Sequence, residues 1–230
     1  FYPASTAEMV LYSSGITSGI VIDSGEAGTY AMPVFECYSI PYYSGKLDIG
    51  GRHVTDQIKK ALQQRGYSLN NEKDILNDLK SQICYITPDP TQNVQDAPTK
   101  TFTAPDGTEV KLASQAYLCP EILFRPMLCN VDQPGTSEIT SKVISSIDDD
   151  IRDILANNIV LAGGSTLFPG YADRLSKDLT DYLPEQKTHI ISDPNRIIST
   201  WVGGSILSSL STFPKLYLSK DQYEENGASI

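Results

Sequence analysis

The strongest constraint on the fold is the segment 158–173, NIVLAGGSTLFPGYAD, in which a short apolar run ends in two glycines. The run at 158–162 predicts a buried strand, Gly163 and Gly164 predict a turn, and the spacing of the leucines predicts a helix over 169–183. Glycines after a strand allow a ligand to approach the backbone closely, and the N-terminus of the next helix attracts an anion. The segment therefore favours a phosphate-binding turn, although an ordinary strand–helix turn has the same pattern.

A second turn places an acid beside a glycine. Residues 18–23, SGIVID, predict a buried strand, and residues 30–38 predict a second strand after the turn Asp23-Ser24-Gly25. An acid at the end of a strand can hold a Mg²⁺-bound water while backbone N–H groups face phosphate oxygens. The same tripeptide also forms ordinary hairpin turns, so both interpretations stay open.

A third glycine turn adds a cation. Gly50-Gly51-Arg52 precedes residues 54–65, whose apolar positions recur every four residues and predict a helix. An acid turn and two glycine turns of this kind form a set suited to holding a nucleotide. The sequence has no GxSxG, HExxH or Walker Gly-Lys-Ser/Thr motif, so it offers no recognisable nucleophile–base pair.

The rest of the chain alternates helical and strand patterns, which predicts an α/β fold. Helices are expected over 71–85 (capped by Asn70 or Asn71), 137–155 and 201–210, a strand over 190–191, a loop over 86–104 and a hairpin turn at 105–107. The acidic run Asp148–Asp150 favours a solvated helix start, with a metal site as the less favoured alternative.

The net charge, the length of the apolar runs and the cysteine spacing disfavour several classes of protein. The net charge of -10 disfavours a protein that binds the nucleic acid backbone, and no apolar run reaches the roughly 18–20 residues of a membrane helix. The first residues lack the pattern of a signal peptide and a starting Met, so the chain is expected to begin in mid-fold.

The four cysteines have no CxxC spacing and there are two histidines, which disfavours zinc and favours buried free thiols in a reducing compartment. They are Cys37, Cys84, Cys119 and Cys129.

Six segments, in the same order along the chain, resemble the family of actin and actin-related proteins. They are residues 11–28, 47–62, 65–86, 119–126, 150–175 and 201–230. The resemblance implies the α/β ATPase fold shared with ribonuclease H-like proteins, sugar kinases and heat-shock chaperones, with the N-terminal half absent. It assigns 1–13 and 199–230 to part of subdomain 1, 14–49 and 131–198 to subdomain 3, and 50–130 to subdomain 4.

The resemblance also implies the site residues. The nucleotide-binding set is Asp23, Ser24, Gly25, Gly51, Arg52, Lys80, Gly163, Gly164, Ser165, Leu167 and Phe168. Asp23 is the catalytic candidate and the metal contact through water, and the implied cofactors are ATP or ADP with Mg²⁺ (or Ca²⁺). A cleft for actin-binding partners is implied at Gly15, Thr17, Ile206, Leu207 and Leu210.

Some positions depart from the family pattern. Thr6 and Tyr30 stand where the family has a glutamine and a histidine that position the attacking water, and Glu26, Ser81 and Ile197 are further changes around the nucleotide. One hypothesis is a filament-forming protein with slow ATP hydrolysis in the cytoplasm and cytoskeleton, with the nucleus as the alternative location. The other is a structural subunit of a larger actin-family assembly that holds nucleotide without hydrolysing it. A sugar-kinase activity is disfavoured because no base for a sugar hydroxyl stands out.

Overall fold

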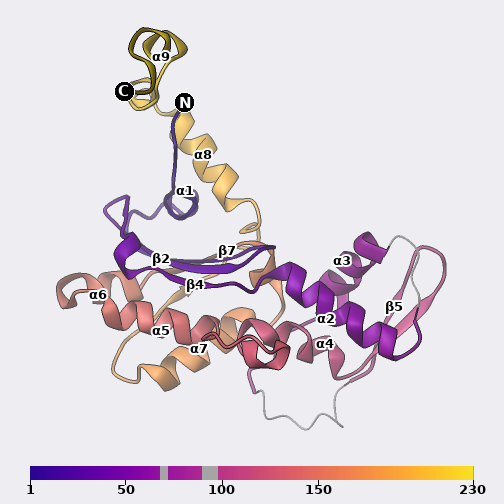
Figure 1. Ribbon diagram of the computed structural model, residues 1–230. Coiled ribbons are helices and arrows are strands. Elements are labelled where there is room, and N and C mark those ends of the chain that lie inside the picture. The colour runs from indigo at the N-terminus through magenta and orange to yellow at the C-terminus, as the bar shows by residue number, and fades with distance from the viewer. Residues whose placement is uncertain (68–71, 90–97, 230) are drawn as a thin grey trace.

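The computed structural model describes residues 1–67, 72–89 and 98–229. It has two lobes with a continuous apolar core (Figure 1). One lobe is built on a mixed sheet, and the second lobe comprises the described residues of 51–129. The predicted cap at Asn70 or Asn71 lies outside the described residues.

The mixed sheet has the order β3-β2-β1-β7-β8, with β4 also pairing with β2. Its strands are β1 (Gly19–Ser24), β2 (Thr29–Phe35), β3 (Tyr38–Ser39), β4 (Gly45–Leu47), β7 (Ile159–Ala162) and β8 (Ile190–Ile191). Strands β1 and β2 form the predicted antiparallel hairpin, and β7 runs parallel to β1 with Ala162 opposite Asp23. The acid turn after β1 and the glycine turn after β7 therefore leave the sheet at the same edge.

Helices cover both faces of this sheet because its strands alternate in the side chains they bury. Ile20 and Ile22 face the larger core, whereas Val21 faces a smaller core on the other side. The larger core lies under α5 (Thr136–Ser146), α6 (Asp149–Ala156) and α7 (Tyr171–Tyr182), and the smaller one under α1 (Thr6–Ser13), which packs on α8 (Ser199–Ser209). Figure 1 shows α5 and α7 on one face and α1 and α8 on the other.

The second lobe joins helices to a small hairpin. It contains α2 (Gly51–Gln64), α3 (Glu72–Ile83), β5 (Lys100–Thr103), β6 (Glu109–Leu112), α4 (Gln115–Leu118) and the 3-10 helices η3 (Pro120–Leu123) and η4 (Pro126–Cys129). The predicted stripe of Val54, Ile58 and Leu62 is buried. The hairpin predicted around residues 105–107 is confirmed, with Phe102 opposite Val110.

Three sequence predictions need correction. The expected loop at 86–104 contains strand β5, because Phe102 is buried in the lobe core. The helix expected over 137–155 is two helices, since the backbone at Ile147 is extended (ψ 142°). The acids that follow fall in the first turn of α6, as the interpretation of 148–150 as a helix start required. The glycine turn after β7 leads into the 3-10 helix η5 (Gly164–Leu167), so α7 begins only at Tyr171.

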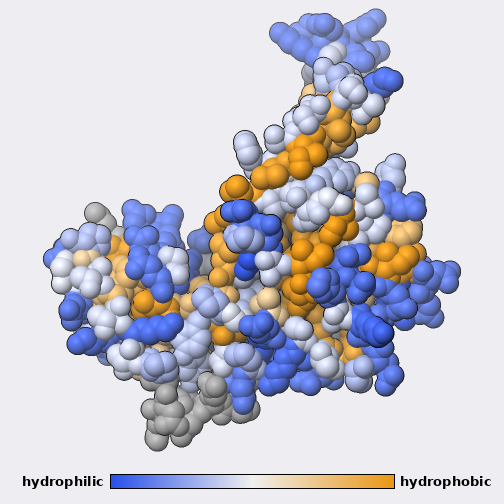
Figure 2. Space-filling view, turned by 180° about the vertical axis from the view of Figure 1, so that it is seen from behind, coloured by the Kyte–Doolittle hydropathy of each residue, from blue (hydrophilic) through white to orange (hydrophobic). Residues whose placement is uncertain are grey.

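The end of the chain returns to its beginning. Leu218 exchanges backbone hydrogen bonds with Phe1, before α9 (Lys220–Asn226) and the 3-10 helix η7 (Gly227–Ser229). Two further 3-10 helices are η1 (Pro41–Tyr43) and η6 (Phe213–Lys215). Hydrophobic side chains run along α8 (Figure 2), with Trp201 and Ile206 exposed on it and Leu210 exposed just after it. Among the helices described, none is both long and apolar enough to span a membrane.

The cysteines are free thiols, but only two are fully buried. Cys84 and Cys119 lie in the core, and burial raises the pKa of each thiol to about 12. Cys37 and Cys129 are only partly covered. The expectation that all four thiols are buried is therefore wrong for these two.

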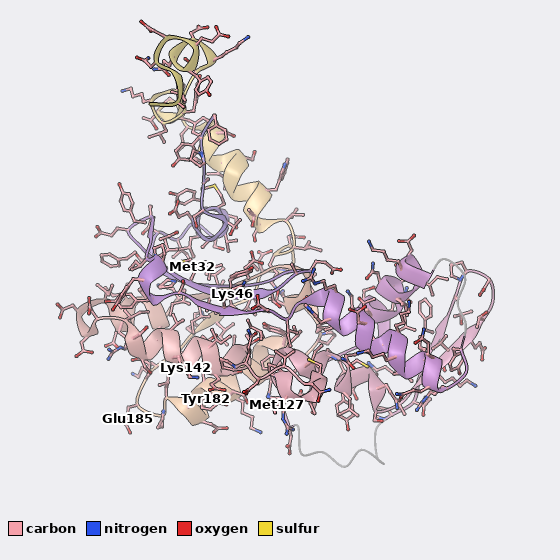
Figure 3. The ribbon with its side chains drawn as sticks, in the orientation of Figure 1. Met32, Lys46, Met127, Lys142, Tyr182 and Glu185 are labelled. Carbon is pink, nitrogen blue, oxygen red and sulfur yellow. The ribbon has the colours of Figure 1, made fainter. Side chains whose placement is uncertain are left out.

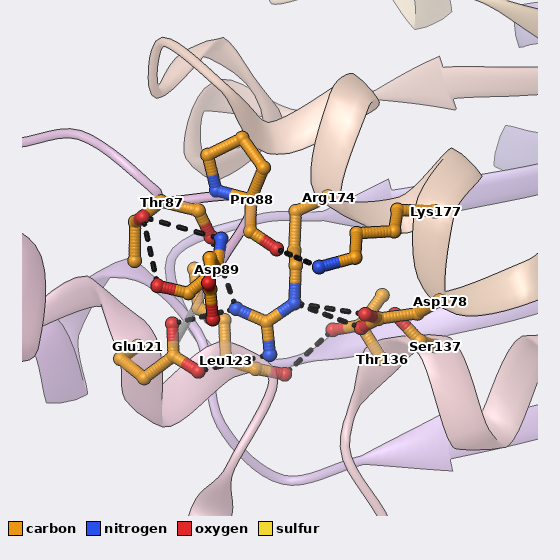
Figure 4. Close-up of polar contacts among 10 residues, drawn as sticks. All are labelled: Thr87, Pro88, Asp89, Glu121, Leu123, Thr136, Ser137, Arg174, Lys177 and Asp178. Carbon is orange, nitrogen blue, oxygen red and sulfur yellow. Dashed lines mark hydrogen bonds and ion pairs between the residues drawn. The ribbon is translucent and has the colours of Figure 1, made fainter. Parts of the chain in front are cut away.

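A buried ion cluster connects the two lobes (Figure 4). Arg174 on α7 lies 2.9 and 3.0 Å from the two carboxylate oxygens of Glu121 in the second lobe. Its Nε donates to Asp178, and Nη1, which also donates to Glu121, donates to the backbone oxygen of Thr87 at 3.2 Å. Burial lowers the pKa of Arg174, but the hydrogen bonds and charge of Glu121 outweigh burial and raise it. Two carboxylates, Glu121 and Asp178, face the guanidinium, and burial raises the pKa of Glu121 although Arg174 opposes this shift.

Candidate functional site

A cavity of about 670 Å³ opens where the two lobes meet. It lies between the turn after β1, helix α3, the turn after β7 and the segment that precedes α8. Its lining residues are Gly25, Glu26, Lys73, Asn77, Lys80, Ser81, Gly164, Ser165, Leu167, Phe168 and Ile197. This volume falls within the roughly 300–1,000 Å³ that small-molecule sites occupy.

Hydrogen bonds join the three predicted turns at this cavity. The backbone oxygen of Gly25 accepts from the amide of Gly51 at 2.8 Å and from the hydroxyl of Ser165 at 3.0 Å. The amide of Arg52 donates to the backbone oxygen of Glu26 at 3.0 Å. Segments more than a hundred residues apart in the sequence are thus fixed against each other at the cavity wall.

The glycines of the site fall into two kinds. Gly163 has φ +84°, and a Cβ there would lie 2.4 Å from the backbone oxygen of Ser24, so the fold itself requires glycine. A Cβ on Gly164 would meet nothing closer than Ile197 at 3.6 Å, and one on Gly25 nothing closer than 4.0 Å. Both line the cavity, so the space that a side chain would fill is left open to a ligand.

Lys80 supplies a positive charge inside the cavity. Its ammonium donates to the hydroxyl of Thr55 at 2.9 Å and to the backbone oxygen of Gly51 at 3.1 Å. The carboxylate of Glu26 lies 3.9 Å away but is 63% exposed, against 14% for the lysine. Burial lowers the pKa of Lys80, and Glu26 only partly opposes this shift. An anionic ligand would therefore stabilise the charge that the protein leaves partly uncompensated.

Asp23 lies behind the cavity wall, at the end of β1. It is partly buried, and this burial raises the pKa of its carboxyl. Within the described part of the chain the carboxylate has no hydrogen bond or ion pair, and its Oδ1 lies 2.6 Å from the place of a Cβ on Gly163. The described residues hold no group of three His, Cys, Asp or Glu side chains that could bind a metal. A cation near Asp23 would therefore keep water ligands, as Mg²⁺ commonly does.

One side of the cavity is apolar. Phe168 is buried at its wall, whereas Leu167 and Ile197 are exposed. Arg196 fixes the turn that carries Leu167 and Phe168, because its guanidinium donates to the hydroxyl and the backbone oxygen of Thr166 at 2.9 and 2.8 Å. An aromatic ring and aliphatic side chains on a fixed turn suit the flat face of a base.

Six of the eleven residues predicted to bind nucleotide line the cavity: Gly25, Lys80, Gly164, Ser165, Leu167 and Phe168. Asp23, Ser24, Gly51 and Gly163 lie behind this wall, and Arg52 lines a neighbouring cavity. Two lining residues, Lys73 and Asn77, were not predicted. Their signal was the helical spacing that places them on the same face of α3 as Lys80.

Thr6 and Tyr30 occupy the positions at which the family places its water-positioning residues, and both lie outside the cavity lining. Thr6 is exposed at the start of α1. Tyr30 is exposed on β2, and its ring lies 6.0 Å from the ammonium of Lys46 on β4, labelled in Figure 3. Neither residue lines the cavity.

The residues predicted to form the partner cleft belong to the packed pair α1 and α8. Gly15 and Thr17 are exposed just after α1, and Ile206 and Leu210 are exposed on and just after α8. Leu207 is buried. The two helices approach closely because a Cβ on Gly203 would lie 1.7 Å from the backbone oxygen of Met9.

The comparison with known families agrees with this arrangement. A family model described as Actin matches residues 1–230, the whole of the sequence given. The match and the mixed α/β structure confirm the family and the fold class predicted from the sequence. Members of this family generally bind a nucleotide and a divalent cation. On this evidence, the chain belongs to the actin family.

Proposed function

We propose that this protein binds ATP or ADP, together with Mg²⁺ or Ca²⁺, in the cavity between its lobes. The observation that carries the proposal is the pair Gly25 and Gly164, on two adjacent turns, whose missing side chains leave open space at the same cavity. The partly uncompensated ammonium of Lys80 supports an anionic ligand there. A plain structural turn would not need glycine at either position.

The residues present fit such a ligand. The turn at 163–168, with Phe168, would hold the base, and Lys80 would lie beside it. The turn at 23–25 would face the phosphates, and Gly51 the sugar. Asp23 would take the cation through a water, and the cation would supply positive charge for the phosphate oxygens.

We further propose that the protein assembles into filaments and hydrolyses ATP slowly, with Asp23 as the catalytic candidate. A specific observation favours the alternative, a structural subunit of a larger assembly that keeps its nucleotide intact. Thr6 and Tyr30 replace residues that position water in the family, and both are exposed away from the cavity lining. Bound nucleotide would then stabilise the fold by linkage alone.

The subdomain assignment and the partner cleft belong to the same proposal. Residues 50–130 would be subdomain 4, 14–49 with 131–198 subdomain 3, and the two ends part of subdomain 1. The exposed Ile206 and Leu210 would receive an amphipathic helix of an actin-binding protein. The protein would act in the cytoplasm and cytoskeleton, with the nucleus as the alternative.

Binding can be tested by calorimetric titration of the purified full-length protein with ATP and Mg²⁺. We expect Gly164→Val to weaken binding by at least about tenfold, or 1.4 kcal/mol, because its side chain enters the cavity. Gly204→Ala is the matched control, since a Cβ there meets nothing within 4 Å. Equal affinities for the wild type and Gly164→Val would refute the proposed site.

Hydrolysis is tested separately by following phosphate release over long incubation. The filament-forming ATPase predicts release that exceeds the buffer control, increases on assembly and is lost in Asp23→Ala. Intact ATP recovered from assembled protein would support the structural subunit instead.

A further inference from the structure

A second cavity, of about 230 Å³, adjoins the first between α2 and α3. Its lining residues are Glu26, Arg52, Thr55, Asp56, Lys59, Lys73, Leu76 and Asn77. Glu26, Lys73 and Asn77 line both cavities. A ligand in the first cavity can therefore extend a substituent into the second past these shared side chains.

The second cavity is locally positive in an acidic protein. It gathers Arg52, Lys59 and Lys73 against Glu26 and Asp56, whereas the whole chain carries a net charge of -10. Within the described residues, Arg52 and Lys73 form no ion pair. Two cations at one small cavity thus have no ion-pair partner among the residues that the structure describes.

Among the described residues, the two carboxylates of the second cavity, Asp56 and Glu26, form no ion pair with Arg52 or Lys73, and that of Glu26 lies at the border with the first cavity. The Glu26 carboxylate lies 3.9 Å from the ammonium of Lys80, which belongs to the first cavity. The hydroxyl of Thr55 and the amide of Asn77 add neutral hydrogen-bonding groups, and buried Leu76 contributes an apolar wall. A cavity of about 230 Å³ exceeds the roughly 30 Å³ share of one water several times over, so a phosphate group fits.

We propose that the second cavity binds an additional phosphate, carried on the sugar of the nucleotide that occupies the first. The inference rests on the proposed function, because Gly51 and Arg52, the start of α2, would face the sugar. Arg52 and Lys73 would pair with the phosphate oxygens, and arginine suits such a planar, two-point contact. The favoured ligand class is therefore an adenosine nucleotide phosphorylated at the 2′ or 3′ position as well as the 5′ position.

The test compares adenosine 5′-monophosphate with adenosine 3′,5′-bisphosphate and 2′,5′-bisphosphate on the full-length protein by calorimetry. We expect at least one bisphosphate to bind the wild type about tenfold more tightly than the monophosphate. Arg52→Gln should reduce this ratio to near one, and the ratio isolates the second cavity because both nucleotides share any contact that Arg52 makes with the sugar. Lys73→Gln should also reduce the ratio, and the exposed Lys142→Gln should not.

The outcomes separate the two proposals. If ATP binds but the bisphosphates bind no more tightly than the monophosphate, the additional phosphate site is refuted and the nucleotide site stands. A preference for a bisphosphate that persists in both Arg52→Gln and Lys73→Gln would likewise refute the second cavity as its origin. If neither ATP nor any of these nucleotides binds, the proposed function fails and this inference with it.

Discussion

Two regions of this molecule hold a cation against a carboxylate, and they differ in how completely the pair is enclosed. Arg174 and Glu121 are 4% and 3% exposed and meet through two contacts. Lys80 is 14% exposed, whereas Glu26 is 63% exposed and lies 3.9 Å away. The first cation is paired with carboxylates inside the protein, and the second faces a cavity.

The difference indicates separate roles for the two regions. A buried pair with good geometry fixes the lobes relative to each other, because separating its partners would leave a charge without solvent. An exposed carboxylate is screened by water and contributes little to the free energy of unfolding. We therefore expect changes at the junction to alter stability and changes at the cavity to alter ligand affinity.

The largest effect is expected at the junction. Glu121→Gln should lower the free energy of unfolding by up to about 3–5 kcal/mol, because Asp178 alone would then compensate the buried charge of Arg174. Urea unfolding without nucleotide measures this. Lys142→Gln is the control, since the Lys142–Glu138 pair is exposed and should be worth within about 0.5 kcal/mol. A loss below 1 kcal/mol for Glu121→Gln would show that the pair does not connect the lobes.

Lys80→Met should have the opposite effect, with a large loss of nucleotide affinity and a small change in stability. Nucleotide affinity should fall by about 1.5–3 kcal/mol, or roughly 10- to 150-fold, as expected for a hydrogen bond to a charged group. The free energy of unfolding without nucleotide should change by less than about 1 kcal/mol, because burial already disfavours the ammonium. Calorimetry and urea unfolding on the same samples test both halves. A variant that is strongly destabilised but binds ATP normally would contradict the assignment of Lys80 to the ligand.

Asp23→Asn should change how stability depends on pH, and it should also weaken ATP binding. Burial raises the pKa of Asp23, so from about pH 4 up to the raised pKa the folded state holds a proton that the unfolded state has lost. The contribution of Asp23 to stability should therefore fall as pH rises through that window, and the asparagine variant should lack this fall. Its affinity for ATP in the presence of Mg²⁺ should drop about tenfold.

Urea unfolding between pH 4 and 7, without nucleotide or metal, measures the difference between wild type and Asp23→Asn. Parallel stability curves for the two proteins over the whole range would show that the carboxyl is not shifted by the fold.

Local patterns in the sequence predicted the parts of the fold that local chemistry decides. The strand before Asp23 and the strand before Gly163 were predicted correctly, because an apolar run bounded by turn residues has few alternatives. The break at Ile147 was missed. Apolar residues continue through it at helical spacing, and the two helices are separated by extended backbone at Ile147 and Asp148.

Local sequence patterns could not predict the contacts between the lobes. Glu121 and Arg174 are 53 residues apart, and nothing local to either residue indicates its partner. Lys73 and Asn77 share a helix face with Lys80, but this spacing also fits an ordinary solvated face, and only the turn after β7 across the cavity gives them a role. Resemblance to a family supplied the residues that the family shares, but not those particular to this chain.

The smallest effect is expected at Tyr171, which lies between the junction and the turn that carries Asp23. Its ring centre lies 5.0 Å from that of Phe124, whose ring also lies 5.0 Å from the guanidinium of Arg174. Its hydroxyl lies beside those of Ser24 and Thr136 but makes no hydrogen bond of regular geometry to the described residues, and burial raises its pKa to about 12.

Removing this hydroxyl in Tyr171→Phe should change the free energy of unfolding by less than about 1 kcal/mol, because a buried group without a partner contributes little. ATP affinity should stay within about twofold, since the ring that packs on Phe124 remains. Urea unfolding and calorimetry of this variant test whether the regions are independent. If the substitution lowered stability by more than 2 kcal/mol and also weakened ATP, the hydroxyl would couple the Asp23 turn to the junction. Stability and binding would then no longer divide between the two ion pairs.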